Sequence, residues 1–152
     1  MKVEIIKCLK DNFSYLLINE KNQNACVIDP SESGPIIDFV EKKNINLRFI
    51  LNTHHHYDHV GGNINLKKKY ESKFVGFKSD KDRIPEIDIL VEDGQIWTNE
   101  DFESKLFIFQ DIHQDIYVFI SKNKKLLLLE ILCFHLVVAE YLSVHTSKCL
   151  YL

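Results

Sequence analysis

The sequence predicts an α/β protein with a mixed sheet. Short apolar runs rich in β-branched and aromatic residues alternate with amphipathic helical patterns along the first two-thirds of the chain. One pair of runs is separated only by a few polar residues, which indicates an antiparallel hairpin within the otherwise alternating pattern. At 152 residues, with 45% hydrophobic and 27% charged residues, the chain has the size and composition of a single globular domain.

The expected strands are short apolar segments that end at polar or turn residues. In order they are 1–6, 13–18, 25–28, 47–51, 74–77 and a strand that follows a loop within 84–92. The polar residues 19–24 join the second and third strands in a hairpin, and Asp29-Pro30 ends the third. Asp93-Gly94 has the composition of a further hairpin turn.

Two helices are expected between these strands. Residues 35–43 carry four apolar side chains at helical spacing, namely Ile36, Ile37, Phe39 and Val40. The second helix, 63–70, has three lysines near its end, where cations interact favourably with the helix dipole. Gly61-Gly62 precedes this helix and, without side chains, allows a tight backbone turn where the helix begins.

The charge balance and the cysteines limit the class of protein. Net charge is −3, from 19 basic and 22 acidic residues, so no polybasic face indicates nucleic acid or an anionic membrane as a partner. The four cysteines, Cys8, Cys26, Cys133 and Cys149, are scattered, and the first residues are too few and too charged for an export signal. We expect reduced thiols and a cytoplasmic location. A monomer is also expected.

The segment from Thr53 to Gly62 contains the residues most specific for a function. It places four imidazoles and a carboxylate in six consecutive positions, in a chain with seven histidines. These are the nitrogen and oxygen ligands that bind zinc and similar ions. The run is internal and is interrupted by Asp58, unlike an expression tag. A solvated polar loop is the alternative to a metal site.

The spacing within the run suits two metal ions. His54 and His56 are two residues apart, so in an extended segment both side chains lie on the same side and can share one ion. Asp58 and His59 follow about one turn later and can reach a second ion. Metal binding lowers the pKa of coordinated water from near 16 to roughly 7, and two ions ~3.5–4 Å apart can hold hydroxide and polarise the group under attack.

This run resembles the His-x-His-x-Asp-His motif of the metallo-β-lactamase superfamily. It is more similar still to the Thr-His-His-His-x-Asp-His-x-Gly-Gly-Asn run of the hydroxyacylglutathione hydrolase (glyoxalase II) family. Neighbouring segments are similar too, at 11–17, at 27–30 and at 82–85 before Asp93-Gly94. The resemblance covers residues 1–110. It implies an α/β fold that is the N-terminal part of an αββα sandwich, truncated relative to the family.

The resemblance also implies a set of ligands and a substrate. His54 and His56 belong to the first metal, and Asp58 and His59 belong to the second. The ions are two divalent metals, expected to be zinc, and the substrate is a small-molecule glutathione thioester. No catalytic residue beyond a metal-bound water is predicted.

Two further residues near the run have open roles. His55 is interpreted as a packing residue, or as one that orients a ligand, in preference to a ligand. Asp29 either orients a ligand from behind or is a turn residue that ends a strand before Pro30.

The resemblance ends at Gln110. The family continues with Thr-Pro-Gly-His-Thr-Ser-Gly-His, which supplies the third ligand of the first metal, and later with Phe-Thr-Gly-Asp-Thr-Leu-Phe, whose aspartate bridges both ions. This chain instead reads Asp-Ile-His-Gln-Asp-Ile-Tyr-Val at 111–118, followed by a leucine-rich tail. The histidines of this part are interpreted as accidental rather than as ligands; they are His113, His135 and His145.

The genetic code offers an explanation for this change. Codons for residues 111–118 begin GA, AT, CA, CA, GA, AT, TA and GT. If the reading frame starts one base upstream, each new triplet combines the last base of the preceding codon with these two bases. The new triplets then permit Gly-His-Thr-Ser-Gly-His-Ile-Cys. The same shift over residues 129–141 permits Thr-Gly-Asp-Thr-Leu-Phe-Ser-Leu-Gly-Cys-Gly-Arg-Ile. In the shifted frame only a few residue types are possible at each position. It is therefore hard to attribute to chance that the same shift permits two separate motifs of the family. We therefore predict a partial metallo-β-lactamase-like domain at 1–110 and an out-of-frame tail at 111–152.

Three functional hypotheses follow. The resemblance implies a binuclear-metal thioester hydrolase that cleaves S-(2-hydroxyacyl)glutathione to glutathione and a 2-hydroxy acid. The out-of-frame tail favours an impaired or inactive remnant, because protein zinc sites use three or four ligands. Another hydrolase of the superfamily, of phosphodiesterase or nuclease type, is the alternative.

The tail itself allows two interpretations. Residues 126–142 are apolar enough to suggest a membrane helix. The acidic residues within them, Glu130 and Glu140, favour a buried or poorly folded segment instead.

Overall fold

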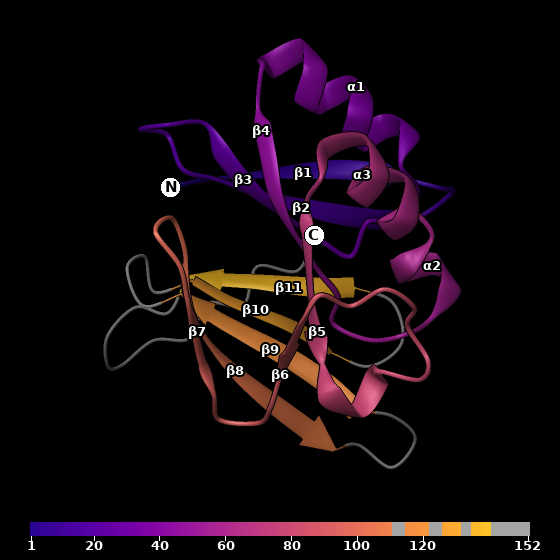
Figure 1. Cartoon of the computed structure of the whole chain (residues 1–152), viewed down its shortest axis with the longest axis vertical. Helices are drawn as coiled ribbons and strands as arrows, with labels where there is room; N and C mark the ends of the chain where they lie inside the picture. Colours follow the sequence, from indigo (N-terminus) through magenta and orange to yellow (C-terminus); the bar gives the residue numbers. More distant parts are fainter. Residues whose placement is uncertain (111–114, 122–125, 132–134, 141–152) are drawn as a thin grey trace. The chain divides into compact units, whose positions relative to one another are not determined.

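The computed structural model describes the backbone of residues 1–110, 115–121, 126–131 and 135–140 (Figure 1). The chain forms two compact units, Met1–Val91 and Glu92–Leu152. Each unit is built on one sheet, and the histidine run belongs to the first unit. The predicted change of reading frame near Gln110 falls within the second unit and stays a prediction.

The first unit has a mixed sheet in the order β1-β2-β3-β4-β5-β6. The first three strands pair antiparallel, whereas β3 to β6 pair parallel, so the predicted α/β class with a mixed sheet is confirmed. All six strands lie at the predicted apolar runs. They are β1 (Lys2–Cys8), β2 (Asn12–Ile18), β3 (Asn24–Ile28), β4 (Asn46–Leu51), β5 (Lys73–Phe77) and β6 (Ile89–Val91).

Two helices, α1 (Gly34–Lys43) and α3 (Asn63–Tyr70), connect the parallel strands at the positions that the sequence predicts (Figure 1). Ile36 and Val40 of α1 and Leu66 of α3 are buried in one core cluster together with apolar residues of the strands. This burial holds the helices on the sheet, because each helix is short and gains its stability from its apolar face.

The carboxyl ends of β3 and β4 lie at one edge of the sheet, because the two strands are parallel neighbours with Ile28 opposite Leu51. Asp29 leaves β3 at this edge, where its N–H donates to the Leu51 carbonyl oxygen at 2.9 Å. The histidine run leaves β4 beside it and forms a short helix, α2 (Tyr57–Val60), which was not predicted. Ligands of α/β proteins bind outside the carboxyl ends of parallel strands, so this edge is where a site is expected.

The second unit contains an antiparallel sheet in the order β11-β10-β9-β8-β7. Its strands are β7 (Ile96–Thr98), β8 (Glu103–Gln110), β9 (Asp115–Ser121), β10 (Leu126–Ile131) and β11 (His135–Glu140). The segment considered as a membrane helix is therefore strand wherever it is described. None of the helices in the described ranges is long and apolar enough to cross a membrane.

The Asp93-Gly94 turn does not close a hairpin, so this prediction is wrong. It joins β6, which pairs parallel with β5, to β7, which pairs antiparallel with β8 in the other sheet. Gly94 has the positive φ, 72°, that favours glycine in such a turn. Turn composition indicates local backbone geometry, but it does not determine which partners the flanking strands select.

Gly61 and Gly62 form the predicted turn before α3, and a close approach of two backbone segments requires their lack of side chains. Their φ angles, −59° and −86°, are open to any residue. However, a Cβ at Gly62 would lie 2.7 Å from the Pro30 carbonyl oxygen, which already accepts the Gly62 N–H at 2.7 Å. The glycine pair therefore holds the segment after Asp29 against the start of α3.

We expect Gly62→Ala to lower the free energy of unfolding by about 1–3 kcal/mol, because the added methyl group forces these two backbone segments apart. Urea denaturation followed by far-ultraviolet circular dichroism measures the change. Gly34→Ala is the matched control, since a Cβ at Gly34 meets nothing within 4 Å. Equal stability of the two variants would contradict the close approach.

Candidate metal centre

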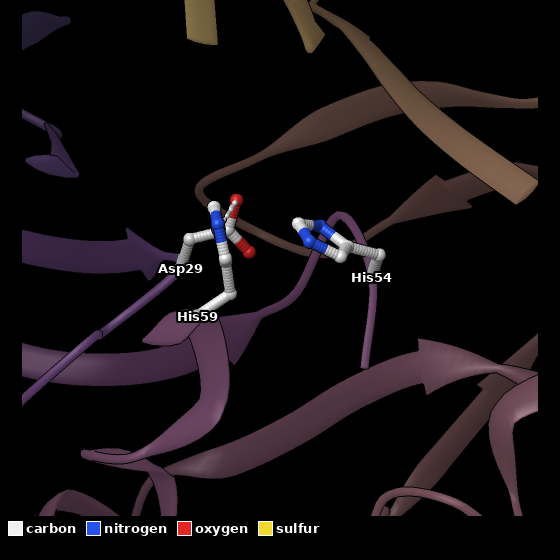
Figure 2. Close-up of side chains that lie close together, drawn as sticks. All are labelled: Asp29, His54 and His59. Carbon is white, nitrogen blue, oxygen red and sulfur yellow. Dashed lines mark ion pairs between the residues drawn. The ribbon is translucent and has the colours of Figure 1, made fainter. Parts of the chain in front are cut away.

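Asp29, His54 and His59 form a group whose ligand atoms all lie within 4.8 Å of one another. Asp29 follows β3, His54 follows β4, and His59 lies in α2. Figure 2 shows the Asp29 carboxylate beside the His59 ring, with the His54 ring directed toward both. Asp29 and His54 are buried, with 1% and 6% of their surface exposed. The group therefore lies in the protein and not on a solvated loop.

The Asp29 carboxylate organises this group. Its Oδ1 accepts the backbone N–H of Thr53 at 2.7 Å, and its Oδ2 accepts the Thr53 hydroxyl. The same Oδ2 lies 3.3 Å from His59 Nδ1. Burial raises the pKa of Asp29, but the His59 and His54 imidazoles and the Thr53 hydroxyl outweigh burial and hold this pKa below its usual value. Asp29 thus ends β3 and lies within ion-pair distance of the candidate ligand His59.

These contacts leave the Nε2 atoms of His54 and His59 for a metal. His59 Nδ1 faces the Asp29 carboxylate, the arrangement by which proteins fix the tautomer of a metal-binding histidine. The Thr53 hydroxyl donates its single proton to Asp29, so toward His54 Nδ1, 3.1 Å away, it can only accept. These contacts favour the tautomer with the proton on Nδ1, in which each ring offers its Nε2 lone pair to a metal.

Asp58 and His59 have the separation of two ligands of one ion. Asp58 Oδ2 lies 3.6 Å from His59 Nε2, and ligands that surround a tetrahedral zinc at ~2.0–2.1 Å stand roughly 3.4 Å apart. Asn12 Nδ2 donates to Asp58 Oδ2 at 3.0 Å and to the Asp58 carbonyl oxygen at 3.2 Å. Burial raises the pKa of Asp58, but the Asn12 hydrogen bond and the His59 imidazole lower it on balance, which favours the carboxylate form.

His54 connects the two predicted pairs of ligands. Its ring centroid lies 4.6 Å from that of His56 and 4.0 Å from that of His59. Burial and the neighbouring imidazoles lower the pKa of His56, which favours the neutral form that binds metal. The structure brings all four predicted ligands to one place, and their division between two ions stays a prediction.

His55 lies outside this group, with its Nδ1 3.5 Å from Asp80 Oδ1. The interpretation of His55 as an orienting or packing residue stays a prediction. His113 and His145 lie outside the described residues, and only the backbone of His135 is described. Their interpretation as accidental histidines stays a prediction.

Three asparagines that hold the site were not predicted, namely Asn12, Asn52 and Asn63. Asn52 Nδ2 donates to the His59 carbonyl oxygen at 2.8 Å, and Asn52 Oδ1 accepts from Asn63 Nδ2 at 2.7 Å. Asn52 and Asn63 flank the histidine run, so their position was a usable signal. Asn12 meets Asp58 across 46 residues of sequence, and nothing in the spacing of the chain indicates that contact.

Fold and side chains together define an α/β protein with a histidine-rich candidate metal centre at the carboxyl edge of its parallel strands. The family model described as "Metallo-beta-lactamase superfamily" matches residues 11–87. The chain therefore belongs to the metallo-β-lactamase superfamily.

Two curated relatives have the same name. The chain is 60% identical to "Hydroxyacylglutathione hydrolase" of Pelagibacter ubique (strain HTCC1062) over 107 residues, which are 70% of this chain and 45% of that protein. It is 42% identical to the protein of the same name from Rhodopseudomonas palustris (strain BisB5) over 94 residues, 62% of this chain and 37% of that protein. The chain thus spans less than half the length of these relatives.

Solved structures share the fold. The B3 metallo-beta-lactamase BLEG-1 superposes with a TM-score of 0.72 at 15% identity, covering 80% of this chain and 68% of that one. ETHE1 from Myxococcus xanthus superposes with a TM-score of 0.67 at 17% identity, covering 80% and 54%. At these identities the likeness shows the fold alone, and it agrees with the predicted sandwich class.

We expect Asn12→Ala to weaken zinc binding by about 10–100-fold, because the Asp58 carboxylate loses the donor that orients it. Competition with a chromogenic chelator measures the affinity. Asn46→Ala is the control, since exposed Asn46 pairs with Asn24 instead of a candidate ligand. Similar zinc affinity in the two variants would show that Asn12 does not orient the site.

Proposed function

We propose that residues 1–110 carry half of the active site of a hydroxyacylglutathione hydrolase-type enzyme. The complete site hydrolyses the thioester of an S-(2-hydroxyacyl)glutathione to glutathione and a 2-hydroxy acid, so the partner is a small-molecule glutathione thioester. The observation that carries the proposal is the convergence of His54, His56, Asp58 and His59 at one edge of the sheet. The names of the relatives supply the substrate class.

Two divalent ions are the proposed cofactors, and zinc suits the nitrogen and oxygen ligands. When bound, such ions supply a water of lowered pKa beside a Lewis acid. The chain's own residues hold and orient the ligands. Asp29 and Thr53 engage the Nδ1 atoms of His59 and His54, and Asn12 holds the Asp58 carboxylate.

We also propose that residues 111–152 are read out of frame, which leaves this chain impaired or inactive. The third ligand of the first ion and the aspartate that bridges both ions then lie in the other frame. Two protein ligands per ion hold zinc weakly, since protein sites normally use three or four.

The cellular location and the oligomeric state are also part of the proposal. A cytoplasmic monomer without nucleic acid or membrane as partner is proposed. The net charge of −3 and the free, buried thiols of Cys8 and Cys26 support this proposal. One relative, from Arabidopsis thaliana, is named "Hydroxyacylglutathione hydrolase cytoplasmic".

Metal analysis of the purified chain together with a hydrolysis assay tests the proposal. We expect weakly held zinc and little or no hydrolysis of a 2-hydroxyacyl glutathione thioester. Two tightly bound ions with thioester turnover would contradict impairment while supporting the enzyme class. Turnover of phosphodiesters but not of thioesters would replace the substrate class with the phosphodiesterase or nuclease alternative.

A further inference from the structure

The segment Asp82-Arg83-Ile84-Pro85 has no role in the site described so far, although it lies beside the histidine run. It follows the short 3-10 helix η1 (Lys78–Asp80) at the end of β5. β5 is the parallel neighbour of β4, with Val75 opposite Leu51. The histidine run and η1 therefore leave the sheet at the same edge, which brings His55 and Asp80 together.

Asp80 is a buried carboxylate between two nitrogen groups. It is 1% exposed, and its Oδ1 lies 2.5 Å from Arg83 Nη2 and 3.5 Å from His55 Nδ1. A buried carboxylate is unfavourable unless it is paired and hydrogen-bonded. Asp80 Oδ1 makes no hydrogen bond within the part of the chain that the structure describes. Its compensation is the charge of Arg83, and His55 lies within ion-pair distance of the same oxygen, so the carboxylate stands between these two side chains.

The backbone around Asp80 directs Arg83 toward it. The N–H groups of Arg83 and Ile84 donate to the Asp80 carbonyl oxygen at 2.9 and 2.8 Å, which closes a turn. Ile84 is 2% exposed and belongs to the core cluster, so it anchors this turn. The Arg83 side chain, 43% exposed, reaches back to the carboxylate from the surface.

We propose that Asp80 and Arg83 form a clamp that positions His55 and, through it, the neighbouring ligands His54 and His56. The proposal rests on the metal centre proposed above. His55 lies between the two ligands in the chain, so holding its ring restrains the backbone that carries both. Asp80 and Arg83 are positioning residues, and neither binds the metal.

Zinc affinity of the full chain, measured by chelator competition, tests the clamp. We expect Asp80→Asn to weaken zinc binding about 10-fold, as loss of an outer partner of a metal ligand does. Asp82→Asn, at an exposed carboxylate two residues away, is the matched control and should change the affinity by less than about two-fold.

Variants of His55 separate positioning from general stabilisation. Asn can place its amide nitrogen near the position of His Nδ1, so His55→Asn should keep most of the affinity, whereas His55→Leu should lose as much as Asp80→Asn. Because Asp80 acts through His55, a chain with both Asp80→Asn and His55→Leu should bind zinc no more weakly than a chain with His55→Leu alone. A purely structural role would instead give losses that add.

Each outcome decides a different claim. Unchanged zinc affinity in a folded Asp80→Asn chain, or additive losses in the double variant, would overturn the clamp while the metal centre stands. If Asp80→Asn does not fold, Arg83→Gln at its half-exposed position should show the same 10-fold loss, and an unchanged affinity there would overturn the clamp equally. If neither the wild-type chain nor a chain translated in the other reading frame after codon 110 binds zinc, the metal centre itself is refuted.

Discussion

A chain translated in the frame one base upstream from codon 110 onward is expected to hydrolyse S-(2-hydroxyacyl)glutathione at least roughly 10³-fold faster than the present chain. The shifted codons permit the histidine and aspartate motifs that, by family resemblance, complete both metal sites. A fully held metal contributes several kcal/mol to the transition state, and each 1.36 kcal/mol is about tenfold in rate. Initial rates of thioester loss, with zinc content measured on the same samples, test this expectation.

The control is His54→Ala in the restored frame, which removes the imidazole that lies next to both His56 and His59. Its rate should return to that of the present chain. Equal rates in the two frames would contradict the proposal that residues 111–152 impair the site. If the restored-frame chain binds zinc but does not hydrolyse thioesters, the proposed metal centre is supported and the proposed substrate class is contradicted.

Asp29→Ala is expected to lower the free energy of unfolding by about 1–3 kcal/mol, the cost of leaving buried hydrogen-bond donors without their acceptor. The change leaves the Thr53 N–H, the Thr53 hydroxyl and His59 Nδ1 without the carboxylate that they face in a buried place. Urea denaturation in the presence of a chelator measures the protein's own stability, apart from any bound metal.

Asp38→Ala is the matched control for Asp29→Ala, because Asp38 is an exposed carboxylate on α1. Its effect should stay within about 0.5 kcal/mol. An Asp29→Ala chain as stable as the control would mean that Asp29 merely ends β3. Zinc affinity of the Asp29 variant should also fall, because the orientation of His59 is lost with the carboxylate.

The strands and helices of the first unit follow from local sequence signals. The apolar run that forms β4 and the polar residues between β2 and β3 each specify their element through burial and turn chemistry. Local signals do not determine which strands pair with one another, because pairing depends on contacts between residues that are distant in sequence. The turn composition of Asp93-Gly94 predicted that the two flanking strands pair with each other. Instead, β6 pairs with β5 and β7 pairs with β8.

The sequence alone predicts the ligands of the candidate site, but it does not predict most of the residues that hold these ligands in place. His54, His56, Asp58 and His59 stand close together in the sequence, so their spacing alone predicts a shared site. Their supports come from other strands. Asn12 reaches Asp58 from β2, and Asp80 reaches His55 from the end of β5. Such contacts are created by the parallel and antiparallel pairing of the sheet, which a single sequence does not display.

The nucleotide sequence of the gene over codons 105–152 tests the central claim most directly. We predict that the frame one base upstream is open and encodes Gly-His-Thr-Ser-Gly-His-Ile-Cys beside codons 111–118 and Thr-Gly-Asp-Thr-Leu-Phe beside codons 129–134. Stop codons in that frame, or other residues in place of these two motifs, would contradict it. The four candidate ligands in residues 54–59 would then have no partner ligands in the other reading frame.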